Sequence, residues 1–471
     1  MQLKLALPKG RLLDKTAALL ETAGMGFAGY HEGSRSYRLR SARFPHLQAK
    51  VFHEKDIPVQ VAVGNYDLGI CGLDWIEELT VRYPQSDLVK VQDLEYGNGD
   101  LYMAASKASG ISSAEELGTR QGSWRLASEY PNLAEAFALK LRLSRFVVFP
   151  VWGAAEVYPP ESADLALISQ PAADRLSDYG LVPLAPILSN RAFLIANRNS
   201  WEAKDMAEVL DLLCHCRMDV GRAESQPASA ADVPRPPAPE EMAEDAVWLA
   251  LPDGHQQAPT IRLLSGSGLK IQGYSPLSAD RRPTVDLAGV RVKVIRPQDM
   301  PLQVANGNFD LAITGRDWLM DHLCRFPSSP VKEVLDLEFA RVKVVAVVSK
   351  ELPVDDVSGL RELVRDGRGL RVASEYVNIA DKYARDNHLS PYKVIPTWGA
   401  SEAFLPEDAD LLIENTETGR TLAQHNLKII DTLFESSSCL ISTASSLEHP
   451  AKRGRISSII DMMRSPTALS L

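Results

Sequence analysis

The stretch that decides the fold is KDIPVQVAVGNYDLGICGLDW, Lys55 to Trp75, because it recurs later in the chain as QDMPLQVANGNFDLAITGRDW, Gln298 to Trp318. The shared aspartates, Asp56 and Asp299, lie 243 residues apart. A period of this length is far longer than a solenoid repeat and has the size of a whole folding unit. We therefore predict a tandem duplication.

The repeat extends on both sides of this stretch, with its segments in the same order in both copies. These segments are LALPKGR (5–11) and LALPDGH (249–255), VQDLEY (91–96) and VLDLEF (334–339), RLASEY (125–130) and RVASEY (371–376), and VWGAAE (151–156) and TWGASE (397–402). Residues 222–245 between the copies are rich in Pro, Ala and charge, which is typical of a linker. We expect a first unit at residues 1–221, a linker at 222–245 and a second unit at 246–471.

Composition restricts the function. The 471 residues are 45% hydrophobic and 24% charged, with a net charge of −10, which disfavours a basic nucleic-acid-binding protein. We find no apolar run long enough for a membrane span, and the apolar run at the start is too short for a secretory signal. The five cysteines form no disulfide spacing pattern. We expect a cytoplasmic protein that binds neither nucleic acid nor membrane.

Within each copy, short β-branched runs such as LGICG and FVVFPV alternate with helix-like stretches such as RLLDKTAALLETAG. This alternation predicts an α/β fold. Each copy exceeds the commonest domain size, which favours two lobes with a cleft between them. The lobe boundaries are expected near residues 96–100 and 339–343, after the DLE motif.

The most specific motif is ENTETGRTLAQHNL, Glu414 to Leu427, where an apolar strand runs into Thr-Gly-Arg-Thr and a helix-like segment. Gly419 permits a tight turn, the following backbone N–H groups form an anion nest, and Thr418 and Thr421 add hydroxyl donors. Glu414, at the strand end, is placed to accept hydrogen bonds from sugar hydroxyls. Together these features suit a 5-phosphoribosyl group. The alternative is a capped helix after a turn, with no ligand.

Two cations stand on a strand-to-helix turn near the start, Lys9 and Arg11 in LALPKGRLL. They could hold a polyphosphate, with the Arg binding in bidentate fashion, although a solvated turn would have the same sequence. Carboxylates recur in both copies, among them Asp317 and Glu402 in the second. These could orient a substrate or cap helices.

Taken together, ALPKGRLL, SRSYRL, the KDIP to GxD run, LDLEF, WGASE and TETGRTL resemble the ATP phosphoribosyltransferase family, over nearly all of residues 1–215 and 247–450. That family performs the first step of histidine biosynthesis. The resemblance implies a bilobal fold like that of type II periplasmic binding proteins. It also implies that ATP and phosphoribosyl pyrophosphate meet in the cleft with Mg²⁺, and that N1 of adenine displaces pyrophosphate from the ribose.

The two copies differ in complementary ways. In the first copy, Gln170 to Arg175 stands in place of Thr416 to Thr421, so the phosphate loop has lost its Gly and both Thr. In the second copy, Asp253-Gly254-His255 stands in place of Lys9-Gly10-Arg11. Neither copy holds a full set of site residues. We therefore hypothesise an internal pseudo-dimer with one composite active site per chain.

The resemblance assigns roles within that site. Lys9, Arg11 and Arg35 are the expected catalytic cations that stabilise the departing pyrophosphate, and sequence alone does not align Arg35 with Arg281 or Arg282. The other expected site residues are Glu414, Glu417, Thr418, Gly419, Arg420 and Thr421 for phosphoribosyl pyrophosphate, and Arg296, Asp317 and Glu402 for ATP. The metal ligands stay unassigned.

An alternative class is a non-catalytic regulatory protein on the same fold that senses a nucleotide or histidine. The decay of motifs in both copies favours this alternative, and the intact TETGRTL loop argues against it. The resemblance also allows a homo-oligomer and a separate regulatory subunit resembling histidyl-tRNA synthetase.

Overall fold

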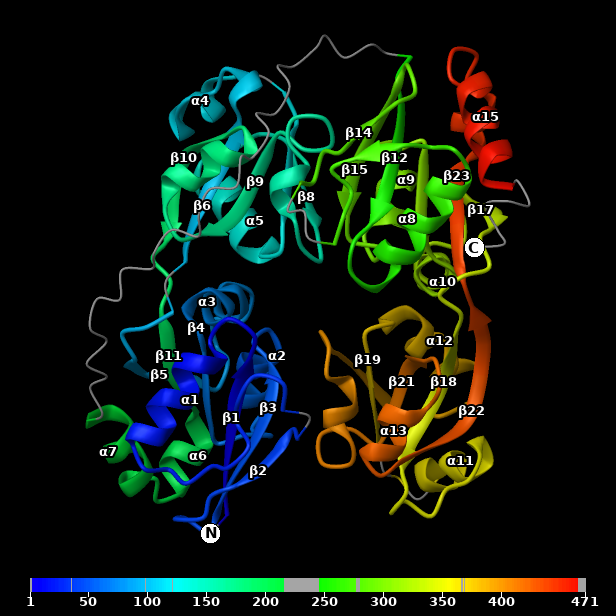
Figure 1. Ribbon diagram of the computed structural model, residues 1–471. Coiled ribbons are helices and arrows are strands. Elements are labelled where there is room, and N and C mark those ends of the chain that lie inside the picture. Colours follow the sequence, from blue (N-terminus) through cyan, green and yellow to red (C-terminus); the bar gives the residue numbers. More distant parts are fainter. Residues whose placement is uncertain are drawn as a thin grey trace. The chain divides into compact units, whose positions relative to one another are not determined.

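The structure is a computed structural model that describes residues 2–34, 36–97, 99–120, 122–215, 245–276, 280–365, 367 and 369–464 (Figure 1). The predicted linker, apart from residue 245, and the predicted site residue Arg35 lie outside these ranges. Within them, no helix is both long enough and apolar enough to cross a membrane.

The chain divides into two compact units. Unit 1 comprises Met1–Pro150, Leu165–Asp232 and Thr397–Ala403, and unit 2 comprises Val151–Asp164, Val233–Pro396 and Phe404–Leu471. Each unit therefore consists of most of one sequence copy and a short segment of the other. We call Val151–Asp164 the 151–164 segment and Thr397–Ala403 the 397–403 segment. Both contain the repeated Trp-Gly motif.

In the part of unit 1 that the structure describes there are two sheets, one in each lobe. The first has the order β2-β3-β1-β4-β11-β5, and the second has the order β10-β6-β9-β7-β8. The strands of the first sheet are β2 (Arg38–Arg40), β3 (Leu47–His53), β1 (Leu3–Lys9), β4 (Leu68–Gly72), β11 (Ala192–Asn197) and β5 (Leu88–Asp93). Those of the second are β10 (Leu181–Leu188), β6 (Asp100–Ser106), β9 (Leu165–Gln170), β7 (Trp124–Ser128) and β8 (Phe146–Pro150).

Unit 2 repeats this plan. Its sheets have the orders β15-β12-β16-β23-β17 and β20-β19-β21-β18-β22, besides a two-stranded β13-β14 ribbon. The first-lobe strands are β15 (Val290–Ile295), β12 (Val247–Pro252), β16 (Leu311–Gly315), β23 (Ser438–Thr443) and β17 (Val331–Asp336), with β13 (Ile271–Gln272) and β14 (Thr284–Val285). The second-lobe strands are β20 (Tyr392–Pro396), β19 (Leu370–Ser374), β21 (Leu411–Thr416), β18 (Val342–Ser349) and β22 (Leu427–Ser436). The predicted class, two bilobal α/β units, is confirmed.

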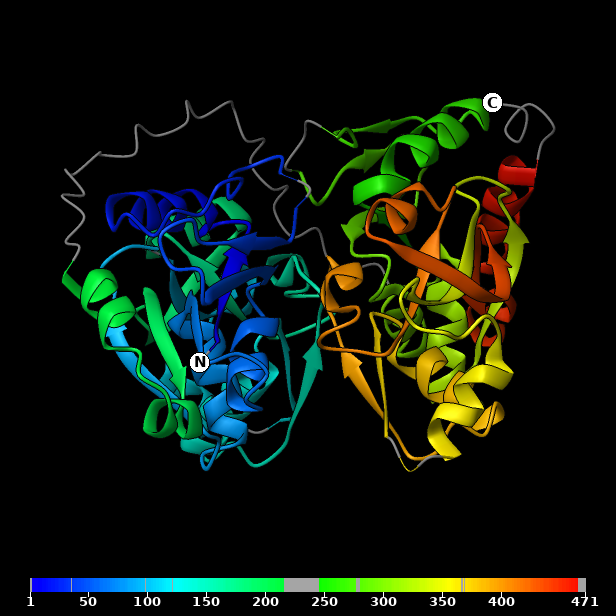
Figure 2. The same ribbon diagram turned by 90° about the horizontal axis from the view of Figure 1, so that it is seen from below.

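Helices pack beside each of these sheets (Figures 1 and 2). In unit 1 they are α1 (Leu13–Thr22), α2 (Asp56–Ala62), α3 (Leu73–Arg82), α4 (Ala114–Thr119), α5 (Pro131–Lys140), α6 (Arg198–Ala203) and α7 (Ala207–His215). In unit 2 they are α8 (Gln257–Gly266), α9 (Met300–Ala305), α10 (Arg316–Arg325), α11 (Val357–Arg365), α12 (Val377–Asp386), α13 (Arg420–Gln424), α14 (Ala444–Glu448) and α15 (Arg453–Arg464).

The lobes of each unit are linked by two passages of the chain. In unit 1 the chain leaves the first sheet after β5 and returns to it as β11, between β4 and β5. In unit 2 the long strand β22 continues into β23, which lies between β16 and β17 in the first-lobe sheet (Figure 1). The second lobes begin at Asp100 and Val342, close to the predicted boundaries.

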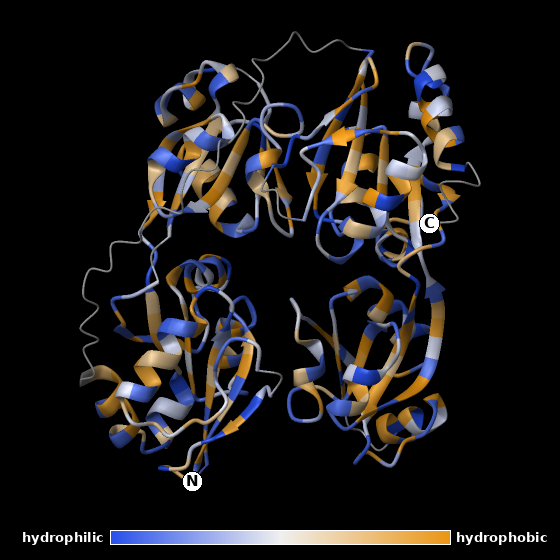
Figure 3. Cartoon of the chain, in the orientation of Figure 1, coloured by the Kyte–Doolittle hydropathy of each residue, from blue (hydrophilic) through white to orange (hydrophobic). Residues whose placement is uncertain are grey.

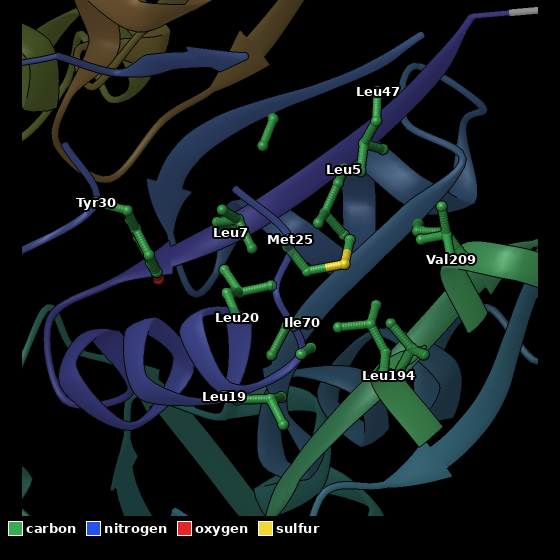
Figure 4. Packing of buried hydrophobic residues seen from close by; sticks show 14 of the residues in the cluster. Leu5, Leu7, Leu19, Leu20, Met25, Tyr30, Leu47, Ile70, Leu194 and Val209 are labelled. Atoms are coloured by element: carbon green, nitrogen blue, oxygen red, sulfur yellow. The ribbon is translucent and has the colours of Figure 1, made fainter. Parts of the chain in front are cut away.

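The core of each lobe follows from its strand sequences. The central strand β1 is buried along most of its length because parallel β3 and β4 flank it and helices cover it. Its Leu5 and Leu7 pack in a cluster with Leu19 of α1 and Leu194 of β11 (Figure 4). Hydrophobic residues are concentrated along the strands in both units (Figure 3).

Ion pairs fix the 151–164 segment within unit 2. The carboxylate of Glu161 lies 2.7 Å from Nζ of Lys293 and accepts two hydrogen bonds from Arg282 at 2.7 and 3.0 Å. Arg282 also donates to the carbonyl oxygens of Val157 and Pro159. Lys293 is 1% exposed, and the Glu161 carboxylate helps to compensate the charge of its buried ammonium.

The stability of unit 2 should depend on Glu161. Burial alone would raise its pKa, but Lys293 and Arg282 outweigh burial and hold that pKa at about 2. We expect Glu161→Gln to lower the free energy of unfolding by about 3 kcal/mol at pH 7, because the variant removes the negative charge that the buried Lys293 ammonium and the Arg282 guanidinium contact. Chemical denaturation followed by circular dichroism measures this change.

The same carboxylate sets the pH dependence of that difference. Its folded pKa lies below the usual 4.5, so its stabilisation is complete above about pH 4.5 and is lost as the pH falls toward 2. Parent and variant should therefore converge in stability near pH 2. Glu351→Gln, at an exposed carboxylate of the same unit, should change stability by less than about 0.5 kcal/mol. A Glu161→Gln effect equally small at pH 7 would contradict the assignment.

Candidate functional site

The predicted phosphate loop follows β21 in the second lobe of unit 2. The chain bends at residues 417–419 and enters the five-residue helix α13 at Arg420. Gly419 has φ +73°, in the left-handed region that favours glycine, and its N–H donates to Oγ1 of Thr416 at 2.9 Å. The side chains of Glu417, Thr418, Arg420 and Thr421 are exposed around this turn. The loop therefore has the turn geometry that its sequence predicts.

The equivalent place in the first copy has a different conformation. After β9, Ala172 is extended with φ −155°, and a 3-10 helix runs from Ala173 to Tyr179. Arg175 on this helix pairs with Asp178 at 3.6 Å. No residue between 170 and 175, all of which the structure describes, has the positive φ of Gly419. The loss of the Gly thus changes the backbone as well as the side chains.

A hydrogen-bonded cluster of polar side chains lies beside the loop of unit 2. Asp317, at the start of α10, accepts a hydrogen bond of 2.8 Å from the hydroxyl of Tyr376 and one of 2.9 Å from the N–H of Trp318. The Tyr376 hydroxyl accepts a hydrogen bond of 2.6 Å from the Asn415 amide, and the N–H of Asn415 donates to Glu414 at 2.9 Å. The cluster connects Asp317 of the first lobe to Glu414 of the second.

Sequence reasoning missed Tyr376 and Asn415 as members of this site. The signal for Tyr376 was present, because Ala-Ser-Glu-Tyr recurs in both copies. Burial raises the pKa of Asp317, and the hydrogen bond from Tyr376 opposes that rise. Tyr376 itself is fully buried, and burial followed by the charge of Asp317 raises its pKa well above the usual value. Its hydroxyl thus stays protonated and donates to the carboxylate.

The corresponding cluster of unit 1 contains Arg11. The Tyr130 hydroxyl donates to Asp74 at 2.8 Å, as Tyr376 does to Asp317. Here, however, the Arg11 guanidinium lies 2.5 Å from the Asp74 carboxylate and 3.0 Å from that of Glu54. Burial raises the pKa of Glu54 to about 7, although Arg11 opposes the shift. Arg11 is therefore held by two carboxylates of its own unit, with its side chain 36% exposed.

Lys9 and Arg11 line a cavity of about 390 Å³ in unit 1. Tyr30 and Tyr37 form part of its wall, and Nζ of Lys9 lies 5.4 Å from the centroid of the Tyr37 ring. Burial, followed by the charge and the hydrogen bond of Glu402, raises the pKa of Tyr37 to about 12. Glu402 belongs to the 397–403 segment of unit 1.

The predicted ATP-binding residues are thus divided between the units. Arg296 and Asp317 are in unit 2, and Glu402 is in unit 1. Arg296 lies 3.1 Å from the carboxylate of Asp253, which also pairs with Arg281 at 2.7 Å. Asp253 stands where the first copy has Lys9, so the substitution brings a carboxylate to this turn.

Backbone hydrogen bonds show which first-copy residues correspond to Arg281 and Arg282. Val51 donates its N–H to the carbonyl of Tyr37, and Val294 donates its N–H to the carbonyl of Arg281. Val51 and Val294 are equivalent in the repeat, so Arg281 corresponds to Tyr37, and Arg282 corresponds to Arg38. Arg35 therefore corresponds to neither Arg281 nor Arg282.

The residues beside the phosphate loop do not form a dedicated metal cage. Within the described part of the chain, no group of three or more His, Cys, Asp or Glu side chains could hold a metal ion. Asp317 is hydrogen-bonded to Tyr376 and Trp318, and Glu414 accepts a hydrogen bond from Asn415, whereas the carboxylate of Glu417 is exposed in the loop itself. This arrangement suits Mg²⁺ that arrives bound to substrate phosphates, because Mg²⁺ is commonly held by one or two carboxylates together with such phosphates.

Fold and site together define a duplicated bilobal α/β protein in which the second copy keeps the Thr-Gly-Arg-Thr turn. The family model described as ATP phosphoribosyltransferase matches residues 53–215 and 296–465, one match in each copy. These matches cover more than half of the chain, which therefore belongs to the ATP phosphoribosyltransferase family. The two matched segments confirm the predicted tandem duplication, and membership confirms the predicted class, a transferase of histidine biosynthesis.

Each of the following relatives matches less than half of this chain. The ATP phosphoribosyltransferase of Chlorobaculum parvum is 33% identical over 221 residues, which are 46% of this chain and 70% of that protein. That of Chlorobium chlorochromatii is 36% identical over 208 residues, 44% of this chain and 67% of that protein. A solved ATP phosphoribosyl transferase (HisG:HisZ) complex from Thermotoga maritima aligns at 22% identity and a TM-score of 0.38, over 45% of this chain and 96% of that one.

Proposed function

We propose that this chain transfers the 5-phosphoribosyl group of phosphoribosyl pyrophosphate to N1 of ATP and releases pyrophosphate. One active site per chain requires residues of both copies. The observation that carries the proposal is the division of motifs: the second copy keeps the loop with its left-handed Gly419, and the first keeps Lys9 and Arg11. Neither copy has both.

The second copy supplies the phosphoribosyl-binding part of this site. The turn at Gly419 presents backbone N–H groups to the 5-phosphate, and Thr418, Arg420 and Thr421 add donors and positive charge. Glu414 accepts hydrogen bonds from the ribose hydroxyls, and Glu417 lies in the same turn. Arg296, Asp317 and Glu402 serve the ATP side. The bond from Tyr376 to Asp317 supports this role, because it fixes the orientation of the carboxylate.

The first copy supplies cations for the leaving group. Displacement at the anomeric carbon develops negative charge on pyrophosphate, so placed cations lower the barrier. The paired carboxylates Asp74 and Glu54 orient the guanidinium of Arg11 before substrate binds. Burial raises the pKa of Glu54, which weakens the hold of this carboxyl on Arg11 and leaves the guanidinium freer to contact the substrate. Lys9 and Arg35 complete the proposed set, and Mg²⁺ enters as a complex with the substrate phosphates.

A pyrophosphate-release assay tests the reaction. We expect release with ATP, phosphoribosyl pyrophosphate and Mg²⁺ present together, and none when either substrate is omitted. If activity appears only after a subunit resembling histidyl-tRNA synthetase is added, the proposed reaction is correct and the chain needs that subunit as a partner.

The alternative is a non-catalytic regulatory protein that senses a nucleotide or histidine. The observation that favours it is the loss of one motif from each copy. The second copy lacks an equivalent of Lys9, and the first copy lacks the phosphate loop. Under this alternative, a ligand raises the melting temperature of the chain while no pyrophosphate is released.

A further inference from the structure

Unit 2 contains an aromatic stack that begins in the first sequence copy. Trp152, in the 151–164 segment, has its ring centroid 5.5 Å from that of Trp318 on α10. Trp318 in turn lies 4.4 Å from Tyr376. Trp152 is partly buried and packs against the core cluster of the second lobe that contains Trp318 and Tyr376. A residue of the first copy, Trp152, thus packs on Trp318, the residue that contacts the Tyr376 ring.

The backbone of Trp152 is firmly anchored. Its N–H donates to both carboxylate oxygens of Asp299, each at 3.1 Å, and the Tyr158 hydroxyl donates to the same carboxylate at 3.3 Å. Asp299 is only 4% exposed. The next residue, Gly153, lies against Arg296, where an added Cβ would be 2.9 Å from Nε. The contacts of Glu161 with Lys293 and Arg282 fix the far end of the segment.

The stack ends at the polar cluster beside the phosphate loop. The Tyr376 hydroxyl bridges Asp317 and the Asn415 amide, and the N–H of Asn415 donates to Glu414. A continuous series of contacts therefore runs from Trp152 to Glu414. A tyrosine that makes two hydrogen bonds needs its ring held from the other side, because a small rotation of the ring moves the hydroxyl away from its partners.

We propose that Trp152 of the first copy is a positioning residue for the phosphoribosyl-binding site of the second copy, acting through Trp318 and Tyr376 on Glu414. This inference rests on the proposed function and deepens it. It gives the first copy a role in substrate binding that is independent of its lost phosphate loop.

Unit 1 offers a matched control. The repeat places Trp398 at the position equivalent to Trp152, in the 397–403 segment of unit 1. Unit 1 also contains the equivalent pair, Trp75 and Tyr130, with ring centroids 4.3 Å apart. However, its phosphate loop is lost, and Ile168 stands where the second copy has Glu414. Removal of the Trp398 ring should therefore not affect phosphoribosyl binding.

Calorimetric titration with phosphoribosyl pyrophosphate and Mg²⁺, together with steady-state kinetics, tests the inference on the full chain. We expect Trp152→Ala to raise both Kd and KM for phosphoribosyl pyrophosphate about 10-fold and to change kcat less than about 3-fold. Trp152→Phe should restore both constants to within about 3-fold of the parent, because a second aromatic ring can pack on Trp318. Trp398→Ala should stay within about 2-fold of the parent.

The split between KM and kcat separates positioning from damage to the fold. Partial unfolding would lower kcat through a smaller active fraction and leave KM unchanged, and that result would overturn the inference. So would binding by Trp152→Ala as tight as that of the parent. If the parent itself fails to bind phosphoribosyl pyrophosphate, the proposed function is wrong and this inference falls with it. Parental binding with an unaffected Trp152→Ala refutes the positioning role alone.

Discussion

Arg11→Ala is expected to lower kcat of pyrophosphate release by about 10² to 10³, the usual loss when one placed charge-stabilising donor is removed. Two carboxylates hold the Arg11 guanidinium in a fixed orientation, that of Asp74 at 2.5 Å and that of Glu54 at 3.0 Å. A cation in this position is ready to stabilise negative charge on a leaving pyrophosphate without first reorganising. The measurement is steady-state pyrophosphate release at saturating ATP and phosphoribosyl pyrophosphate.

The control for Arg11 is its equivalent in the repeat, His255. The second copy cannot hold an arginine between two carboxylates at this place, because His255 and Pro297 stand in the positions of Arg11 and Glu54. We therefore expect His255→Ala to change kcat less than about 3-fold. Arg11→Lys separates charge from geometry, because a lysine keeps the charge but not the planar fork that contacts both carboxylates. Comparable losses in Arg11→Ala and His255→Ala would count against a site that depends on both copies.

Thr418→Ala is expected to lower kcat/KM for phosphoribosyl pyrophosphate by about 10- to 100-fold. A hydrogen bond to a charged phosphate contributes about 1.5–3 kcal/mol, and Thr418 is exposed in the bend before Gly419, where its hydroxyl can reach a ligand. The effect should appear mainly in KM for phosphoribosyl pyrophosphate, since the 5-phosphate does not react. Initial rates over a range of phosphoribosyl pyrophosphate concentrations, at fixed ATP, give this number.

The first copy again provides the comparison. Arg175 is equivalent to Thr421 in the repeat, but it lies on a 3-10 helix and pairs with Asp178 instead of forming a phosphate turn. Arg175→Ala should leave kcat/KM within about 2-fold of the parent. If Arg175→Ala reduces activity as much as Thr418→Ala does, phosphate binding is not confined to the second copy.

Much of the fold could be predicted because the information is local or repeated. Alternation of β-branched runs with amphipathic segments predicts α/β lobes, and the repeat predicts that the second copy has the strand order of the first. The left-handed Gly419 could be predicted as well, because the Thr-Gly-Arg-Thr turn needs a residue that tolerates positive φ. In each case the sequence near the element is sufficient.

The parts that could not be predicted depend on contacts between residues far apart in the sequence. Asp74 lies 63 residues from Arg11, and no periodicity shows that the two side chains meet. The assignment of the 151–164 segment to unit 2 depends on Glu161 reaching Lys293, 132 residues away. Arg35 could not be aligned from sequence because the repeat offset changes by one residue between the LALP and Asp-Ile-Pro segments, and the sequence does not show where. The backbone hydrogen bonds of Tyr37 and Arg281 place this change between Tyr37 and Val51.

The most direct test of the central claim, that one activity needs residues of both copies, is a single pyrophosphate-release experiment. The parent, Arg11→Ala and Thr418→Ala chains are assayed side by side with ATP, phosphoribosyl pyrophosphate and Mg²⁺. With phosphoribosyl pyrophosphate below its KM for the parent, we predict turnover by the parent and a loss of about 10-fold or more in each variant, although the two residues belong to different copies. Full activity of Arg11→Ala beside a strongly impaired Thr418→Ala would contradict the claim, because the second copy would then work alone.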